Sequence, residues 1–206
     1  MPVTNVLLDL GGVLTVDPWQ ALLLTPQRGL VDRLLLDREA VIGAADELWE
    51  FHARHWTDET SYWREMSERI DTAIPAAAVA EAEAELLVTL PDAGDALDFL
   101  SQARTPWGLI TNNTAFWFEK QLALLGLSGS QLEWIFTSFA EGCQKEDGVG
   151  LFDLAAGRLD PAGTLVVDDR TANLERARAA GFVAEQFIEG IGASLPELLE
   201  REVTRR

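Results

Sequence analysis

The 206-residue sequence has little cysteine, little positive charge and no long apolar run. Its one cysteine, Cys143, excludes an intrachain disulfide, so nothing in the chain requires an oxidising compartment. Only 16 lysines and arginines stand against 34 aspartates and glutamates, which gives a formal net charge of −18. Because such a surface repels phosphate backbones and anionic lipid headgroups, we expect neither a nucleic-acid partner nor a membrane partner.

The apolar runs are too short to cross a membrane, and the N-terminal one is interrupted by Asp9. The N-terminus also lacks the basic stretch of a signal peptide. We therefore expect a soluble, cytoplasmic protein. A chain of this length can bury a core of its own, as one domain or as one domain with a modest insertion.

Short apolar runs alternate with helical patterns along much of the chain. Five runs have the length of strands: residues 6–8, 107–110, 134–137, 164–167 and 182–187. This alternation predicts an α/β fold, with a Rossmann-like parallel sheet flanked by helices. Ligands of such sheets bind at the carboxyl ends of the strands, and three of the five runs end in polar clusters. Function is therefore expected at that edge of the sheet.

The chain between the first two predicted strands is about ninety residues long, which is too much for a simple crossover. It shows helical patterns at residues 38–54, 58–70 and 76–88, and Thr57 is the expected N-cap of the second helix. We predict a small helical cap here, inserted directly after the first strand.

The predicted domain boundaries follow from that insertion. Residues 1–15 and 90–206 would form the α/β core, and residues 16–89 the helical cap. The position of the cap suggests a lid over the strand ends.

Acidic residues follow two of the predicted strands. Asp9 comes where an apolar strand stops and the chain turns through Gly11 and Gly12, although a turn or N-cap aspartate would look the same. Asp168 and Asp169 follow another strand, and two adjacent carboxylates repel each other unless a cation relieves the cost. Hard oxygen ligands suit Mg²⁺. The alternative is an acidic pair favoured by a helix N-terminus.

Two further segments carry polar groups of interest. Thr111, Asn112 and Asn113 offer a hydroxyl and backbone N–H groups before a helix, which would suit an anion, but helix capping would also explain them. Lys145 lies in a polar loop and, taken alone, would be a surface lysine.

The order of these segments resembles the four motifs of the haloacid dehalogenase (HAD) superfamily. DLGGVL from Asp9 resembles the first motif, ITNNT from Ile110 the second and GCQKED around Lys145 the third. VVDDRTANLERARAAG, at residues 166–181, resembles the fourth and is the most specific. The insertion resembles the small helical cap of subfamily I, and the nearest relatives look like sugar-phosphate phosphatases and epoxide-hydrolase N-terminal-like phosphatases.

The resemblance implies a hydrolase, a phosphatase with a magnesium site. Asp9 would be the nucleophile that becomes an aspartyl-phosphate. Mg²⁺ would be held by Asp9, the carbonyl of Gly11 and Asp169, with Asp168 beside it or on a metal-bound water.

The resemblance also implies a substrate, a small phosphate ester such as a sugar phosphate, and the way in which it is held. Thr111 and the amide of Asn112 would bind the phosphoryl oxygens, and Lys145 would neutralise charge between Asp9 and the phosphate. Such neutralisation is needed because an anionic nucleophile and an anionic phosphate repel each other.

Two motifs depart from the usual pattern. The family's second aspartate, two residues after the nucleophile, is replaced by Gly11. General acid–base help is typically worth about 10²–10⁴-fold, so this site would favour good leaving groups such as anomeric sugar phosphates or acyl phosphates. The usual Lys-Pro-Asp-Pro of the third motif is Lys-Glu-Asp-Gly at residues 145–148, which predicts a longer or looser loop.

Two other functions are consistent with the sequence. A 2-haloacid dehalogenase would use the same nucleophile without a metal, but it would lack the Asp168–Asp169 pair. A catalytically weak, phosphate-binding regulatory protein would be consistent with Gly11. The cap is rich in aromatic residues and histidines, which would form its core or face the substrate: Trp49, His52, His55, Trp56 and Trp63. Exposed tryptophans in such a cap would also allow a homodimer.

Overall fold

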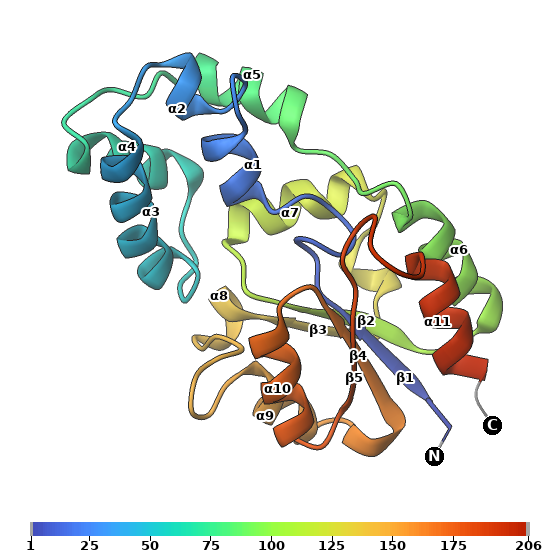
Figure 1. The fold of residues 1–206 in the computed structure, drawn as a ribbon. Helices are drawn as coiled ribbons and strands as arrows, with labels where there is room; N and C mark the ends of the chain where they lie inside the picture. Colours follow the sequence, from blue (N-terminus) through green and yellow to red (C-terminus); the bar gives the residue numbers. More distant parts are fainter. Residues whose placement is uncertain (1, 205–206) are drawn as a thin grey trace.

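The computed structural model describes residues 2–204. Its centre is a parallel five-stranded sheet in the order β3-β2-β1-β4-β5 (Figure 1). The strands are β1 (Asn5–Leu8), β2 (Trp107–Thr111), β3 (Trp134–Thr137), β4 (Thr164–Asp168) and β5 (Val183–Gln186). The predicted α/β fold with a Rossmann-like parallel sheet is thus confirmed, and each strand lies within about a residue of its predicted limits.

Helices cover both faces of the sheet because successive strand residues point to opposite sides. On one face, Leu8 of β1 and Val167 of β4 share a core cluster with three helices: α6 (Ala93–Ala103), α7 (Ala115–Leu124) and α11 (Leu195–Thr204). On the other face, Leu7 and Val166 pack against two helices: α9 (Leu151–Ala156) and α10 (Thr171–Ala179). The short α8 (Ser138–Glu141) follows β3, and two 3₁₀ turns complete the core: η1 (Gly129–Gln131) and η2 (Pro161–Gly163).

Five helices lie between β1 and α6, in residues 16–89, which we call the helical segment. They are α1 (Pro18–Leu24), α2 (Leu30–Arg33), α3 (Arg38–His52), α4 (Glu59–Arg69) and α5 (Ala76–Leu86). The expected N-cap, Thr57, was wrong by one residue, since Asp58 accepts the N–H of Ser61 at 2.9 Å. An aspartate outcompetes the neighbouring threonine here because its carboxylate also favours the positive end of the helix.

The helical segment has its own hydrophobic cluster, built around Leu48, Tyr62 and Met66. Phe116 and Trp117 of α7 belong to the same cluster, so the core contributes two aromatic side chains to it. Figure 1 shows the segment standing beyond the strand ends, beside α7 and α8. The division of the chain into a cap and a core remains a prediction, and this shared cluster ties the two parts together.

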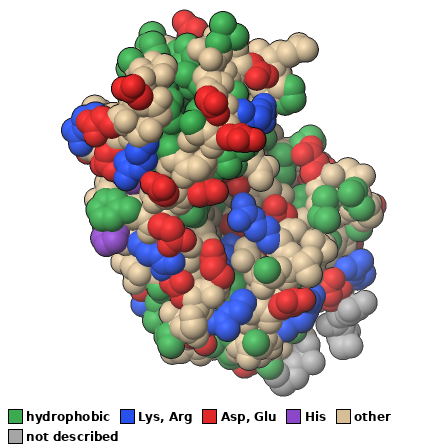
Figure 2. Space-filling model, turned by 60° about the vertical axis from the view of Figure 1, so that its left-hand side comes forward, with side chains coloured by type: hydrophobic (Ala, Val, Ile, Leu, Met, Phe, Trp, Pro, Cys, Tyr) green, Lys and Arg blue, Asp and Glu red, His purple; other side chains and the backbone are tan. Residues whose placement is uncertain are grey.

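Within residues 2–204, no helix combines the length and the apolar character needed to cross a membrane. On the face shown in Figure 2, acidic and basic side chains are interspersed, and the basic ones do not gather into one patch.

Candidate active site

The carboxyl ends of three neighbouring strands bring the predicted residues together. Asp9 follows β1, Thr111 ends β2 and Asp168 ends β4, and β1 lies between the other two strands. The N–H of Asp9 donates to the carbonyl of Val167 at 2.9 Å, which fixes the first residue after β1 against β4. The edge of the sheet expected from the sequence is therefore where these side chains lie.

Lys145 lies between two carboxylates. Its Nζ is 2.8 Å from Oδ2 of Asp9 and 2.6 Å from Oδ2 of Asp168. Burial would lower the pKa of Lys145, but the charges of Asp168 and Asp9 more than offset it, so its pKa lies above the ordinary value. The ammonium is therefore held in its charged form, next to the predicted nucleophile.

Burial raises the pKa of Asp9 to about 7, with the charge of Lys145 opposing that shift and the charge of Asp168 adding to it. Asp9 is 8% exposed, so one side of it still reaches the cavity above. A carboxylate that is desolvated and faces a cavity is suited to act as a nucleophile once a cation favours its ionised form.

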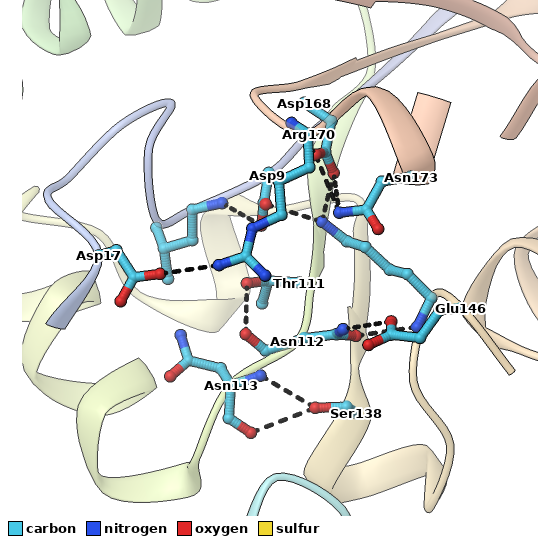
Figure 3. Close-up of polar contacts among 12 residues, drawn as sticks. Asp9, Asp17, Thr111, Asn112, Asn113, Ser138, Glu146, Asp168, Arg170 and Asn173 are labelled. Atoms are coloured by element: carbon cyan, nitrogen blue, oxygen red, sulfur yellow. Dashed lines mark hydrogen bonds and ion pairs between the residues drawn. The ribbon is translucent and has the colours of Figure 1, made fainter. Parts of the chain in front are cut away.

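Asp168 is fully buried, and its oxygens are engaged by the protein itself. Besides Lys145, it accepts the N–H of Arg170 at 2.9 Å and the side-chain amide of Asn173 at 2.9 and 3.1 Å. Lys145 and these donors outweigh the effect of burial and lower the pKa of Asp168. This arrangement makes Asp168 the fixed anion that holds Lys145 in place (Figure 3).

Asp169 has the properties of a cation ligand. Its Oδ1 is buried and has no hydrogen-bond partner in residues 2–204. Burial and the charge of Asp168 raise the pKa of Asp169 by more than the charges of Arg170 and Lys145 lower it, so its ionised form is only partly compensated. Asp9, Asp168 and Asp169 each place one oxygen within 4.8 Å of the others. This oxygen donor set fits a hard divalent ion such as Mg²⁺.

Gly11 and Gly12 form the turn that brings the chain close to Asp169. Gly12 has a φ of +80°, and a Cβ there would lie 2.5 Å from Oδ2 of Asp169. A glycine is therefore required, both for the backbone conformation and for the close approach. Gly11 lines the cavity above Asp9, and metal binding by its carbonyl stays a prediction.

Thr111 and Asn112 differ in what they contact. Thr111 is 1% exposed, and its hydroxyl donates to the carbonyl of Asn112 at 3.4 Å. The Asn112 side chain accepts the N–H of Lys145 at 2.9 Å and donates to Glu146 at 2.7 Å, while Asn112 also lines the cavity. Phosphoryl binding by Thr111 and by the Asn112 amide stays a prediction, and the side chain of Asn112 has the additional task of holding the Lys145 loop.

The expected free N–H groups before α7 are partly occupied. The N–H of Asn113 donates to Ser138 at 2.9 Å, and the N–H of Thr114 donates to the side chain of Asn113 at 2.9 Å. The N-cap of α7 is Thr114. An anion at this turn would therefore have fewer backbone donors than the sequence suggested.

Asp17 and Arg170 are site residues that the sequence did not single out. Both line the cavity over Asp9, where the Arg170 guanidinium lies 3.1 Å from Asp17. Figure 3 shows Arg170 reaching from the end of β4 across Asp9 toward Asp17. Asp17 could have been identified only as the N-cap before Pro18 of α1, and its pairing with a residue 153 positions later leaves no local signal.

The cavity over Asp9 is small, about 30 Å³, and shares Asp17, Trp49 and Arg170 with a larger cavity of about 460 Å³. Trp19, Gln20, Asp46 and Asp169 complete the lining of the larger one. The helical segment thus contributes side chains directly to the candidate site.

Of the five cap residues predicted to form its core or to face the substrate, Trp49 is the one that lines both cavities, and Trp19, which the sequence did not single out, lines the larger one. His52 is buried, with its ring nitrogens facing Thr57 at 2.8 Å and Glu65 at 3.4 Å. Trp63 is buried in the segment's cluster. The interpretation of His52 and Trp63 as core residues therefore fits their positions.

No protein-family model and no curated protein matches the sequence. Solved structures of similar fold do match. A protein of Porphyromonas gingivalis described as a predicted HAD-like family hydrolase is 18% identical, with a TM-score of 0.72 over 100% of both chains. A HAD family enzyme of Bacteroides thetaiotaomicron, in complex with magnesium and inorganic phosphate, is 17% identical, with a TM-score of 0.62 over 93% of this chain and 98% of that one.

A third similar structure is the L-2-haloacid dehalogenase of Xanthobacter autotrophicus with chloropropionic acid covalently bound. It is 16% identical, with a TM-score of 0.60 over 99% of this chain and 90% of that one. At these identities the comparisons establish the fold.

Proposed function

We propose that this chain, which has the fold of the HAD-like hydrolases, is a magnesium-dependent hydrolase of small phosphomonoesters that works through an aspartyl-phosphate on Asp9. The observation that carries the proposal is the carboxylate cluster of Asp9, Asp168 and Asp169, with one buried oxygen of Asp169 left without a hydrogen bond. A buried carboxylate oxygen without a partner is costly, and a bound divalent cation removes that cost.

The residues of the chain supply the other parts of the reaction. Asp9 attacks phosphorus, and Lys145, fixed by Asp168, offsets the repulsion between that carboxylate and the phosphate. Covalent capture divides the hydrolysis into two easier displacements. Bound Mg²⁺, held by Asp9, the carbonyl of Gly11 and Asp169, would supply further positive charge at the phosphoryl group.

Thr111 and the amide of Asn112 are proposed to bind the phosphoryl oxygens. Arg170 adds a second cation above Asp9, at the side where the cavity opens toward Trp49. The leaving group would lie in that larger cavity, whose tryptophans suit the stacking of a sugar ring. Because Gly11 offers no proton donor, we expect faster turnover of anomeric and acyl phosphates than of primary-alcohol phosphates.

A 2-haloacid dehalogenase is the second candidate, because one similar structure is such an enzyme with a covalently bound acid. In a reaction without a metal, however, the buried Oδ1 of Asp169 would have no hydrogen-bond partner among residues 2–204, and its charge would lie beside that of Asp168. The phosphatase is therefore the better-supported proposal. A regulatory protein with little activity is the third candidate, and it rests on Gly11 alone.

One set of assays separates the three. Phosphate release is measured over a panel of sugar phosphates, acyl phosphates and p-nitrophenyl phosphate with Mg²⁺, and chloride release from 2-chloropropionate is measured in EDTA. We expect phosphate release that needs Mg²⁺ and is lost in Asp9→Asn. Chloride release in EDTA would replace the phosphatase by the dehalogenase, and a lack of turnover on every substrate would favour the regulatory protein.

A further inference from the structure

The loop that carries Lys145 has no proline to stiffen it. Residues 145–148 are Lys-Glu-Asp-Gly, and none of them has the fixed φ of proline. The loop nevertheless holds the Lys145 amine within 2.8 Å of Asp9 and 2.6 Å of Asp168. Besides hydrogen bonds within the loop, such as that from the N–H of Leu151 to the carbonyl of Gln144 at 3.2 Å, contacts from outside the loop hold it in place.

Two of these contacts come from the α/β core. Asn112, after β2, accepts the N–H of Lys145 and donates to Glu146. Arg176, on α10, donates to the carbonyls of Asp147 and Gly148, the latter at 3.2 Å. Asn112 thus holds the first half of the Lys-Glu-Asp-Gly stretch, and Arg176 holds the second half.

The third contact comes from the helical segment. Arg54, just after α3, contacts both carboxylate oxygens of Asp147, with one nitrogen–oxygen distance of 3.0 Å. Oδ2 of Asp147 also accepts the N–H of Gln144 at 2.8 Å. One carboxylate thus closes the turn around Lys145 and pairs with the helical segment.

This ion pair is partly shielded from solvent. The side chains of Arg54 and Asp147 are 23% and 26% exposed, so water and salt screen the pair less than an open surface pair. Its two-pronged geometry adds directional specificity that a single contact would lack. The hydrogen bond from Arg54, together with that from Gln144, lowers the pKa of Asp147.

A second contact joins the same two regions. Trp56 packs edge-on against Phe139 of α8, with ring centroids 4.6 Å apart. Phe139 precedes the Lys145 loop in the chain. In Figure 1 the connection between α3 and α4 extends toward α8, so residues 53–57 dock on the segment that leads to Lys145.

We propose that Arg54 is a positioning residue that couples docking of the helical segment to the placement of Lys145. This inference rests on the proposed role of Lys145 in catalysis. When residues 53–57 are docked, Asp147 is paired and the Gln144–Asp147 turn is closed. When they move away, Asp147 loses its cation, the turn loosens, and the Lys145 amine is no longer held between its two carboxylates. Full catalytic competence then requires the helical segment to cover the site.

The test combines kinetics with amide hydrogen exchange on the full-length protein. In Arg54→Ala we expect amides of residues 143–150 to exchange about tenfold faster or more, with β1 and β4 unchanged. We expect kcat on p-nitrophenyl phosphate to fall about tenfold while KM changes less than about twofold. Arg54→Lys should recover part of the loss, and Asp147→Asn should resemble Arg54→Ala without an additive effect in the double variant.

Arg69→Ala is the matched control. Arg69 of α4 pairs with Glu47 and Glu65 of the same helical segment, at 3.5 and 3.6 Å, so its loss removes an arginine ion pair without removing a contact to the α/β core. This variant should leave exchange of residues 143–150 as in the wild type. Unchanged exchange or unchanged kcat in Arg54→Ala would overturn the proposal, as would equal acceleration in Arg69→Ala. Exchange is measured without substrate, so an inactive wild type would reject the proposed function separately.

Discussion

Lys145 and Asp168 form an ion pair of 2.6 Å between side chains that are 1% and 0% exposed. The backbone N–H of Arg170 and the side-chain amide of Asn173 also donate to the Asp168 carboxylate, so residues of the core hold it in place. Lys145 in turn reaches Asp9. The placement of Lys145 beside the candidate nucleophile therefore depends on Asp168, a buried anion that the protein itself holds in place.

Removing that anion should be costly. Asp168→Asn leaves Lys145 buried with only Asp9 as a counter-charge, and we expect the free energy of unfolding to fall by about 3 kcal/mol. Urea denaturation measures the change. Glu68→Gln is the control, because Glu68 is 68% exposed and 3.9 Å from Arg64, and it should change the free energy by less than about 0.5 kcal/mol. A loss below about 1 kcal/mol in Asp168→Asn would contradict the buried-pair argument.

The raised pKa of Asp9 predicts a pH-dependent stability. The pKa of Asp9 is about 7 in the folded protein, against an ordinary value of 3.8. The folded state therefore binds the carboxyl proton more tightly than the unfolded state does. This adds stability that is fully present below about pH 4 and is lost as the pH rises through 7. Asp9→Asn stays neutral, while Lys145 keeps Asp168 as its partner. The free energy of unfolding of Asp9→Asn, relative to that of the wild type, should therefore be about 2–3 kcal/mol higher at pH 8 than at pH 5.

Urea denaturation in EDTA at the two pH values measures this difference, since no cation then compensates Asp9, Asp168 and Asp169. Equal differences at pH 5 and pH 8 would show that Asp9 ionises normally.

The close approach of Gly12 to Asp169 can be tested with a matched glycine. Gly12 and Gly126 both have positive φ, +80° and +65°, but a Cβ meets Asp169 only at Gly12 and finds open space at Gly126. Both alanine variants should lose about 1 kcal/mol of stability through backbone strain. Only Gly12→Ala should weaken Mg²⁺ binding, by about tenfold or more, as measured by calorimetric titration. Equal Mg²⁺ affinity in the two variants would argue against Asp169 as a ligand.

Gly11 is a position where a carboxylate can be introduced. Its φ is not positive, and the nearest atom to an added Cβ is Cα of Asp17 at 3.4 Å, so the backbone accepts a Cβ at this position. In Gly11→Asp we expect kcat/KM on a primary-alcohol phosphate to rise about tenfold or more relative to p-nitrophenyl phosphate, whose leaving group needs no proton. Gly11→Asn supplies the same shape without the proton. A similar gain in both variants would show that the effect is not acid catalysis.

The strand-end residues could be predicted from the sequence because local patterns specify them. An apolar run followed by a carboxylate marks the end of a buried strand, and parallel strands place such ends at one edge. Asp9, Thr111 and Asp168 meet for that reason. The family resemblance added Lys145, whose loop has no periodic signal of its own.

The contacts between the helical segment and the core could not be predicted in this way. Asp17 pairs with Arg170 across 153 positions, and Arg54 pairs with Asp147 across 93. Such pairings depend on how the helices dock, which the spacing of apolar residues does not determine. The N-cap of α4 was also predicted one residue early, at Thr57, because Thr57 and Asp58 are adjacent and both can cap a helix.

The placement of Trp117 gives the protein an internal optical probe. This side chain belongs to α7 but is fully buried under the helical segment, with Trp49 at 6.5 Å and Trp63 at 6.3 Å between ring centroids. Indole emission shifts to longer wavelength when water reaches the ring. Undocking of the helices would therefore register as a red shift of the intrinsic fluorescence, without any attached label.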